Sequence, residues 1–265
     1  MDCKNCNLAL STESDYCAFC GAKVIRNRLT LKNLFFDFSE TYLNFDNKFL
    51  QTFISLFKKP EDVIGSYVNG TRKKYVNVIS YFALALTITG LEYFILNKFY
   101  PEFTDLSAIS RKGVENLTND FTRNVQEYQS FVLMAFVPIY ALMGKIVFFN
   151  IKKFNYTELL VVFMYIIGHL TIVGALIVIP AAMLGAKMGA ISFYILLMQI
   201  IYSAYCLKKL YQLSIKGILL RTGFFVIVLS FIYILSIFIF VGILFLLNGP
   251  EFFKEIIEAQ SATKT

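Results

Sequence analysis

Five long apolar runs, separated by short polar segments, dominate the chain after its first 75 residues. They cover about residues 76–96, 131–149, 159–184, 190–207 and 222–247. A helix needs about 20 predominantly apolar residues to cross about 30 Å of hydrocarbon. The fourth run is short for a span, and the fifth is long enough to tilt. The pattern therefore predicts an all-α integral membrane protein with about five transmembrane helices.

A different periodicity precedes the first apolar run. Aromatic and aliphatic residues recur there at helical spacing among charged residues: Phe45, Phe49, Phe53, Leu56 and Phe57. This spacing predicts an amphipathic helix from about Tyr42 to Phe57 that lies along the bilayer surface or against the membrane bundle. A helix packed on other soluble residues is the alternative, but few such residues are available. Lys58, Lys59 and Pro60 are expected to end this helix.

The composition supports the membrane class. Hydrophobic residues make up 57% of the chain and charged residues only 16%, which lies outside the range of soluble domains. The net charge of +7 could indicate a nucleic-acid partner, but the basic residues gather beside the apolar runs. Positive charge in that position more often fixes membrane orientation. The lipid bilayer is therefore the expected partner, and no nucleic acid is expected.

The distribution of Lys and Arg predicts the orientation. Five spans place the amino-terminal segment and the second and fourth connections on one side, which carries the larger share of the basic residues. The cluster Arg72, Lys73 and Lys74 lies directly before the first run and is interpreted as a membrane-surface cluster that favours anionic headgroups. A site for a substrate phosphate is the less favoured alternative. We expect a cytoplasmic amino terminus, an outer carboxyl terminus, and a location in the cytoplasmic (bacterial inner) membrane.

Four of the five cysteines form two C-x2-C pairs near the amino terminus: Cys3, Cys6, Cys17 and Cys20. Two such pairs supply the four thiolates of a closed tetrahedral zinc site. Two disulfides would suit an oxidising compartment, and a redox-active pair would suit a larger domain. The sequence therefore predicts a zinc ribbon with a structural Zn²⁺, whose folding depends on the metal. A reducing cytoplasm agrees with this prediction.

Ionisable residues inside the apolar runs need an account, because each costs roughly 3 kcal/mol at mid-span on insertion scales. His169 is the only histidine and lies near the middle of the third run. A proton relay, a ligand contact and a hydrogen bond between helices are all open, and a structural histidine is the expectation. Glu92 and Lys145 lie nearer the ends of their runs, and Lys145 can extend to the interface. His169 and Glu92 form the candidate intramembrane polar site.

The chain carries no phosphate-binding glycine loop and no metalloprotease or serine hydrolase motif. We therefore expect a protein that is not an enzyme, with a cytoplasmic docking module on a helical membrane domain. A small-solute or lipid transporter that uses polar residues near His169 is the alternative. The predicted organisation is a zinc ribbon at 1–25, an amphipathic juxtamembrane segment at 26–74, a transmembrane domain at 75–250 and a polar tail at 251–265. The sequence leaves the oligomeric state open.

Several stretches resemble a known family. They are "CKNCNLALSTESDYCAFCGAKV", "DNKFLQTFISLFKKPEDVIGSYVNGTRKKYVNVISYF", "FNIKKFNYTELLVVFMYIIGHL" and, more loosely, "IIYSAYCLKKLYQLS". The chain is similar to an uncharacterised bacterial family of multi-span membrane proteins, known as a domain of unknown function, with an amino-terminal zinc ribbon. Its most distinctive element consists of Pro60, Tyr67, Gly70, Arg72 and Tyr75. The chain has Leu159 after Glu158, where many relatives are expected to have histidine. The resemblance implies a membrane location and a cytoplasmic ribbon but no activity.

Overall fold

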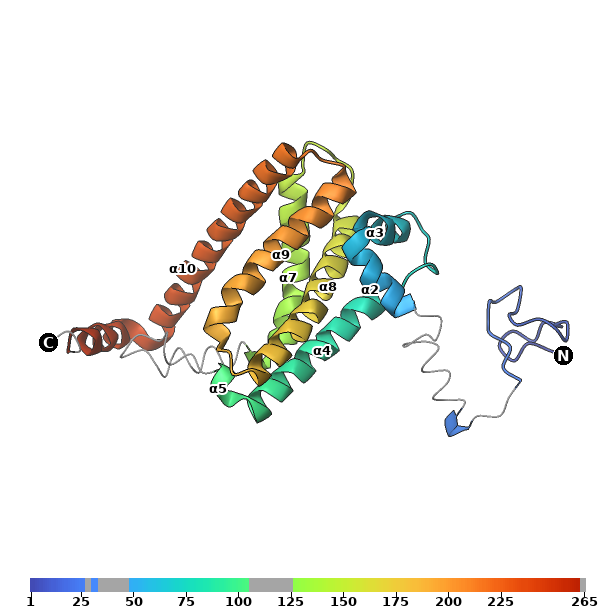
Figure 1. Cartoon of the computed structure of the whole chain (residues 1–265), viewed down its shortest axis with the longest axis horizontal. Coiled ribbons are helices and arrows are strands. Elements are labelled where there is room, and N and C mark those ends of the chain that lie inside the picture. Colours follow the sequence, from blue (N-terminus) through green and yellow to red (C-terminus); the bar gives the residue numbers. More distant parts are fainter. Residues whose placement is uncertain (27–29, 33–47, 105–125, 263–265) are drawn as a thin grey trace. The chain divides into compact units, whose positions relative to one another are not determined.

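The computed structural model describes residues 1–26, 30–32, 48–104 and 126–262, with the side chains of part of the last helix left out. The chain divides into two compact units, Met1–Asp46 and Asn47–Thr265. Unit 1 contains the four clustered cysteines in two small turns, each closed by an isolated β-bridge. Unit 2 is helical in its described part (Figure 1).

Among the residues that the structure describes, five helices of unit 2 are long and apolar enough to cross a membrane. They are α4 (Val78–Phe99), α7 (Gln129–Val147), α8 (Tyr156–Met183), α9 (Met188–Tyr211) and the part Ile215–Ile239 of α10 (Ile215–Ala262). Three shorter helices accompany them in the described part of unit 2: α2 (Lys48–Lys58), α3 (Pro60–Val68) and α5 (Pro101–Thr104). The prediction of an all-α protein with about five membrane-spanning helices is confirmed. These helices indicate a multi-pass membrane protein.

The ends of these helices follow local capping chemistry. α8 begins at Tyr156, before the predicted run, because Asn155 and Glu158 each accept a hydrogen bond from the other's backbone amide. This capping box satisfies amides that have no partner inside the helix. α2 ends at Lys58 and α3 begins at Pro60, as the helix-ending signal predicts. α10 continues through a kink at Gly249, whose φ of 73° lies in the left-handed region that glycine favours.

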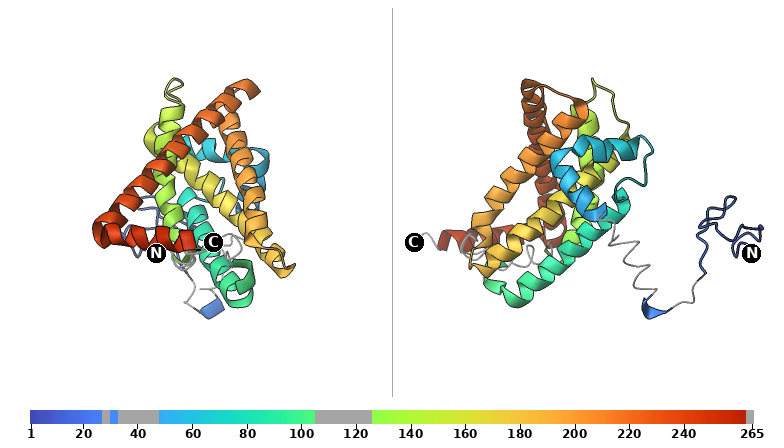
Figure 2. Two further views of the ribbon diagram at one scale, coloured as in Figure 1. Left: turned by 90° about the vertical axis from the view of Figure 1, so that its left-hand side faces the viewer. Right: turned by 45° about the vertical axis from the view of Figure 1, so that its right-hand side comes forward.

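α8 is the central helix of the bundle. In its most apolar window 61% of the residues are buried, against 28% or less in the other four spans. α4 and α7 pack along it, and small residues allow the close approach that membrane helices use. A Cβ atom on Gly168 would lie 3.4 Å from the Phe82 ring of α4, and one on Gly144 would lie 2.9 Å from the Phe163 ring. α3 and α9 also contact α8, whereas α10 packs on α7 and α9, and Figure 2 shows this bundle from two further sides.

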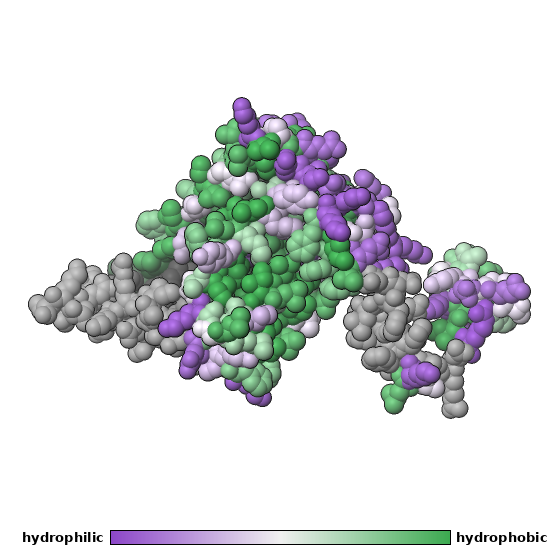
Figure 3. Space-filling model, viewed as in Figure 1, coloured by the Kyte–Doolittle hydropathy of each residue, from purple (hydrophilic) through white to green (hydrophobic). Residues whose placement is uncertain are grey.

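The surface of the bundle is suited to lipid. Figure 3 shows apolar residues over the sides of the long helices, whereas polar residues gather around α3 and at the helix connections. No residue in the most apolar window of α10 is buried, so this helix exposes most of its surface. Such a surface is stable next to lipid tails and would be unstable in water.

The amphipathic segment packs against the bundle. α2 carries the aromatic stripe, of which Phe49 contacts Tyr81 of α4 at 5.8 Å between ring centroids. Leu56 is fully buried, and Thr52 Oγ1 accepts a hydrogen bond from the Val76 amide at 3.0 Å. The first residues predicted for this helix, including Phe45, lie outside the described residues. The periodicity allowed a position along the bilayer surface or one against the membrane bundle. The described part of the helix lies against the bundle.

Candidate metal centre and polar sites of the membrane domain

The four clustered cysteines lie on two turns with the same backbone hydrogen bonds. In the first turn the Cys3 amide donates to the Leu8 carbonyl at 2.8 Å, and in the second the Cys17 amide donates to the Ala22 carbonyl at 2.9 Å. The second turn therefore repeats the first fourteen positions later. This repetition brings two cysteines from each turn to the same centre.

The residue after each C-x2-C pair adopts a left-handed backbone conformation. It is Asn7 in the first turn, with φ 57°, and Gly21 in the second, with φ 70°. Glycine and asparagine are the residues that tolerate this conformation best. The sequence C-x2-C-G was thus informative about the turn as well as about the ligands.

The sulfur atoms form a cage of the right size for a metal ion. Cys3 Sγ lies 3.6 Å from Cys20 Sγ, and Cys6 Sγ lies 3.6 Å from Cys17 Sγ, with all four sulfurs within 4.8 Å of one another. A zinc ion with Zn–S bonds of about 2.3 Å requires sulfurs about 3.8 Å apart at the corners of a tetrahedron. The four cysteines are free thiols, so all are available as ligands. A fourth protein ligand leaves no open coordination position, as is typical of structural sites.

The surface of unit 1 is partly apolar. Six large apolar side chains are exposed among the described residues of this unit, none of them a metal ligand: Met1, Leu8, Tyr16, Phe19, Ile25 and Leu31. Phe19, with 79% of its surface exposed, lies inside the second C-x2-C pair. Figure 3 shows both apolar and polar residues on the surface of this unit. Its surface therefore offers apolar contacts that its own small core does not use.

His169 lies at the centre of an aromatic cluster in unit 2. Its side chain is 1% exposed, and its Nδ1 lies 2.9 Å from the hydroxyl of Tyr81. The rings of Phe53, Phe57 and Tyr202 lie 4.3 to 5.1 Å from the imidazole centroid. Nε2 has no hydrogen-bond partner among the described residues. The cluster joins α2, α4, α8 and α9, so the histidine binds helices to one another.

The structure does not bring Glu92 to this cluster. Tyr81 and Glu92 both lie on α4, and the rise of about 1.5 Å per residue places them roughly 16 Å apart along the helix axis. Glu92 is partly buried. Neither of the two cavities described in unit 2 is lined by His169 or Glu92. The two predicted polar residues therefore do not form one site in the described part of the chain.

The predicted basic cluster is engaged in contacts within the protein. The guanidinium of Arg72 lies 4.1 Å from the centroid of the Tyr67 ring, a cation–π geometry. Lys74 Nζ donates to both carboxylate oxygens of Asp62, at 2.9 and 2.7 Å. Lys73 has contacts of its own. The cluster thus helps to fasten the segment before α4 onto α3.

The Asp62 carboxylate accepts most of the hydrogen bonds that hold this segment on α3. Besides the two bonds from Lys74, it accepts hydrogen bonds from the hydroxyls of Tyr75 and Ser66. The hydrogen bonds from Lys74 and Tyr75 hold the pKa of the Asp62 carboxyl below its usual range, because they favour its charged form. Asp62 was not predicted as a site residue, since no spacing rule connects a carboxylate in the first turn of α3 with the loop that follows the helix.

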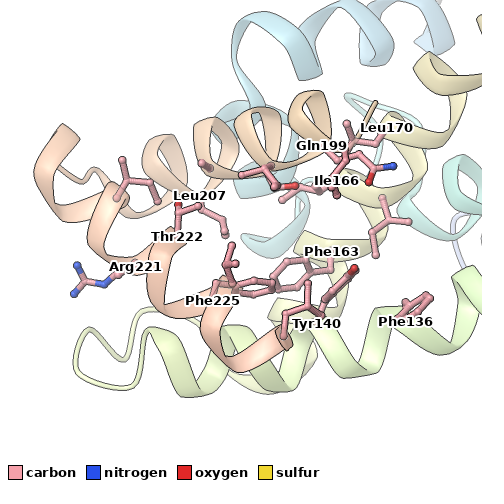
Figure 4. Close-up of a pocket in the computed structure, with 18 of the residues that line it drawn as sticks. Phe136, Tyr140, Phe163, Ile166, Leu170, Gln199, Leu207, Arg221, Thr222 and Phe225 are labelled. Atoms are coloured by element: carbon pink, nitrogen blue, oxygen red, sulfur yellow. The ribbon is translucent and has the colours of Figure 1, made fainter. Parts of the chain in front are cut away.

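A crevice between α7, α8, α9 and α10 was also not predicted from the sequence. Its volume is about 440 Å³, and Figure 4 shows aromatic side chains of α7, α8 and α10 on one wall, with Tyr140, Phe163 and Phe225 next to one another. Arg221 lies at one end of the crevice. The sequence gives no signal for it because its walls consist of residues far apart along the chain.

The chain was compared with protein families, curated proteins and solved structures. No significant match was found among the curated proteins or among the solved structures. One family model matches residues 46–90 of the chain. This segment contains α2, α3, the contacts at Asp62 and the first half of α4. The resemblance to a family of unknown function is thereby confirmed. The family whose model this segment matches is described as "Protein of unknown function (DUF3667)".

Proposed function

We propose that the protein is a non-enzymatic membrane protein whose zinc ribbon docks a cytoplasmic protein partner. The ribbon is attached to a helical membrane domain, and Zn²⁺ held by Cys3, Cys6, Cys17 and Cys20 has a structural role. The exposed apolar surface of the ribbon carries the proposal, above all Phe19. Exposure of an apolar side chain of this size to water is unfavourable, and its burial against a partner would stabilise the complex.

The cysteine set supports a structural ion. Four thiolates favour soft or borderline ions such as zinc, and they leave no position for a water nucleophile. Roughly 25 residues bury too little apolar surface to fold without such an ion. The ribbon is therefore a rigid small platform when the metal is bound, and the side chains on its surface are held in fixed positions.

The orientation belongs to the same proposal. Basic residues are concentrated on the side that also carries the ribbon, and positive charge favours the cytoplasmic side. A cysteine placed at Ser214, in the α9–α10 turn, would then be protected from an impermeant thiol reagent added to intact cells. A cysteine placed at Lys187, in the α8–α9 turn, would react. The opposite labelling pattern would reverse the orientation and remove the cytoplasmic partner.

The docking role is tested by photo-crosslinking in native membranes. A photoreactive amino acid replaces Phe19, and captured proteins are identified by mass spectrometry. The same group at Lys4, an exposed residue of the other turn, is the control. Docking predicts a defined protein captured from position 19 and lost when Tyr16 and Ile25 are changed to serine. Capture of lipid alone, or the same set of proteins from both positions, would contradict docking.

The crosslinking experiment does not test the transporter alternative directly. The surroundings of His169 bear on that alternative. His169 is enclosed by aromatic rings and does not line either described cavity. Transport through His169 would require an aqueous path that reaches it. The enclosed position favours a structural role for this histidine.

A further inference from the structure

The crevice between α7, α8, α9 and α10 has the lining of a lipid-chain site. Most of its walls are aliphatic and aromatic, and polar groups are few: Thr171, Gln199, Ser203, Arg221 and Thr222, with the hydroxyl of Tyr140. A volume of about 440 Å³ falls within the range of ligand pockets. A small polar solute would leave most of these walls without favourable contacts, whereas an acyl chain would cover them.

The length of the crevice matches one leaflet of a bilayer. On α9 its lining runs from Leu196 to Leu207, and on α10 from Ile218 to Leu229. Each stretch rises about 16 Å at roughly 1.5 Å per residue, close to half of the 30 Å hydrocarbon thickness. The crevice therefore extends from the end of the bundle at the α9–α10 turn to about the middle of the membrane.

The crevice has access to lipid along α10. α9 and α10 lie closest at their shared turn and diverge away from it (Figures 1 and 2). No residue in the most apolar window of α10 is buried, so this wall of the crevice borders the lipid-facing surface. A chain of a bilayer lipid can enter from the side without crossing water.

A positive charge stands at the turn end of the crevice. Arg221 Nη2 donates to Asn150 Oδ1 at 3.2 Å, and its guanidinium lies 5.6 Å from the Phe148 ring centroid. Its Nε is buried and has no hydrogen-bond partner among the described residues. A guanidinium has five N–H donors in a fixed fork that matches a phosphate group. Arg221 is thus placed at headgroup level with donor capacity left over.

We propose that this crevice binds an anionic phospholipid, with one acyl chain between α9 and α10 and the phosphate at Arg221. The apolar walls supply the affinity for the chain, and the guanidinium supplies the preference for anionic headgroups. This lipid would also fill the space where α10 lacks packing partners. The inference is independent of the docking role of the ribbon.

The test uses the full chain in phosphatidylcholine vesicles that contain a small fraction of a photoactivatable phospholipid. The photoreactive group is on the acyl chain, and the headgroup is either phosphatidylglycerol or phosphatidylcholine. Labelled residues are mapped by mass spectrometry. We expect labelling of crevice residues such as Gln199 and Phe225, with phosphatidylglycerol labelling them about tenfold more strongly. Both lipids carry the phosphate, but phosphatidylcholine also places a choline cation beside the Arg221 guanidinium, and the two positive charges repel each other.

Two kinds of variant separate the headgroup from the chain. Arg221→Gln should remove the preference for phosphatidylglycerol and leave chain labelling at the phosphatidylcholine level. Ala204→Phe and Thr222→Phe, which fill the crevice from α9 and α10, should abolish crevice labelling with both lipids. The matched controls are Lys216→Gln, an exposed basic residue of the same helix, and Ile227→Phe, which faces outward. Both controls should label like the unchanged chain.

Three results would overturn the proposal. The first is labelling confined to outward residues and insensitive to the filled crevice. The second is equal labelling by both headgroups with no effect of Arg221→Gln. The third is full competition by inorganic phosphate, which would indicate a site for a free anion. If a filled variant fails to fold in circular dichroism and gel filtration, the comparison of headgroups on Arg221→Gln still decides the outcome.

Discussion

Tyr81 and His169 join two membrane-spanning helices through a contact of 2.9 Å between a hydroxyl and Nδ1, buried among aromatic rings. The two residues are 88 positions apart in the chain. Phe53 and Phe57 of α2 cover the imidazole, so the segment before the first span is fixed to the same point. This contact explains how a histidine is accommodated in an apolar interior: one of its two ring nitrogens has a partner, and its ring packs as an aromatic ring.

A double-mutant cycle tests this structural role. Tyr81→Phe should destabilise the full chain by about 1 to 3 kcal/mol, because it leaves both nitrogens of the imidazole without partners. His169→Phe should cost less, since it also removes the unpartnered Nε2. The variant with both changes should be more stable than Tyr81→Phe alone, because neither side chain of the pair then has a buried polar atom without a partner. Thermal unfolding in detergent measures all four proteins, and additive effects would show that the contact contributes no coupling.

The fold was largely predictable because hydropathy is a local property of the sequence. Runs of 18 or more apolar residues indicate spans whatever their neighbours, and all five appear in the structure. Helix ends were less predictable, since they depend on single capping residues such as Asn155. The cysteine cage was predictable for a similar reason: four ligands within 20 residues have a characteristic spacing.

The contacts between distant segments could not be predicted. Nothing in the sequence pairs Tyr81 with His169, Asp62 with Lys74, or Arg221 with Asn150. The basic cluster illustrates the limit. The predicted role of Arg72 and Lys74 at the membrane surface stays a prediction, and the sequence did not indicate the partner that each has inside the protein. Composition predicts the charge of a segment, whereas packing decides what that charge contacts.

Metal removal should affect the two units differently. A strong chelator is expected to unfold the ribbon, because four thiolates without an ion cannot hold its turns together. The amides of Cys3 and Cys17 should then lose protection from hydrogen exchange, while the amides of α8 keep theirs. Cys17→Ser should give the same pattern without chelator, and Cys206→Ser, in unit 2, is the control. Elemental analysis of the unchanged chain should give about one zinc per chain, and its absence would refute the metal site.

Close approach of α4 and α8 depends on Gly168. A Cβ atom there would meet the Phe82 ring at 3.4 Å and the Ala85 Cβ at 3.6 Å. Gly168→Leu should therefore force the helices apart and lower the unfolding free energy by about 2 kcal/mol or more. Gly174, on the same helix, has open space around its Cβ position. Gly174→Leu should change stability little, and equal effects of the two variants in detergent unfolding would contradict this packing.

Acidic pH should weaken the fastening of α3 to the start of α4. The hydrogen bonds from Lys74 and Tyr75 lower the pKa of Asp62 in the folded protein. A lowered pKa means that the stabilisation is fully present above the unfolded value of about 3.9 and is lost as the pH falls through the folded pKa. At neutral pH, Asp62→Asn should be less stable than the unchanged chain by about 1 kcal/mol or less, since the Lys74 pair is half-exposed.

The difference between the two proteins should stay constant from pH 7 down to about 4 and shrink below that, as the pH falls through the lowered pKa of folded Asp62, because protonation of Asp62 removes the same charge that the substitution removes. Thermal unfolding in detergent across this range measures it. Lys74→Gln should flatten the acid response in the same way, since it removes the first cause of the lowered pKa. Glu102→Gln, an exposed carboxylate of α5, is the control and should leave the response unchanged. A difference between the unchanged chain and Asp62→Asn that stays constant with pH would show that the charge of Asp62 does not stabilise this segment.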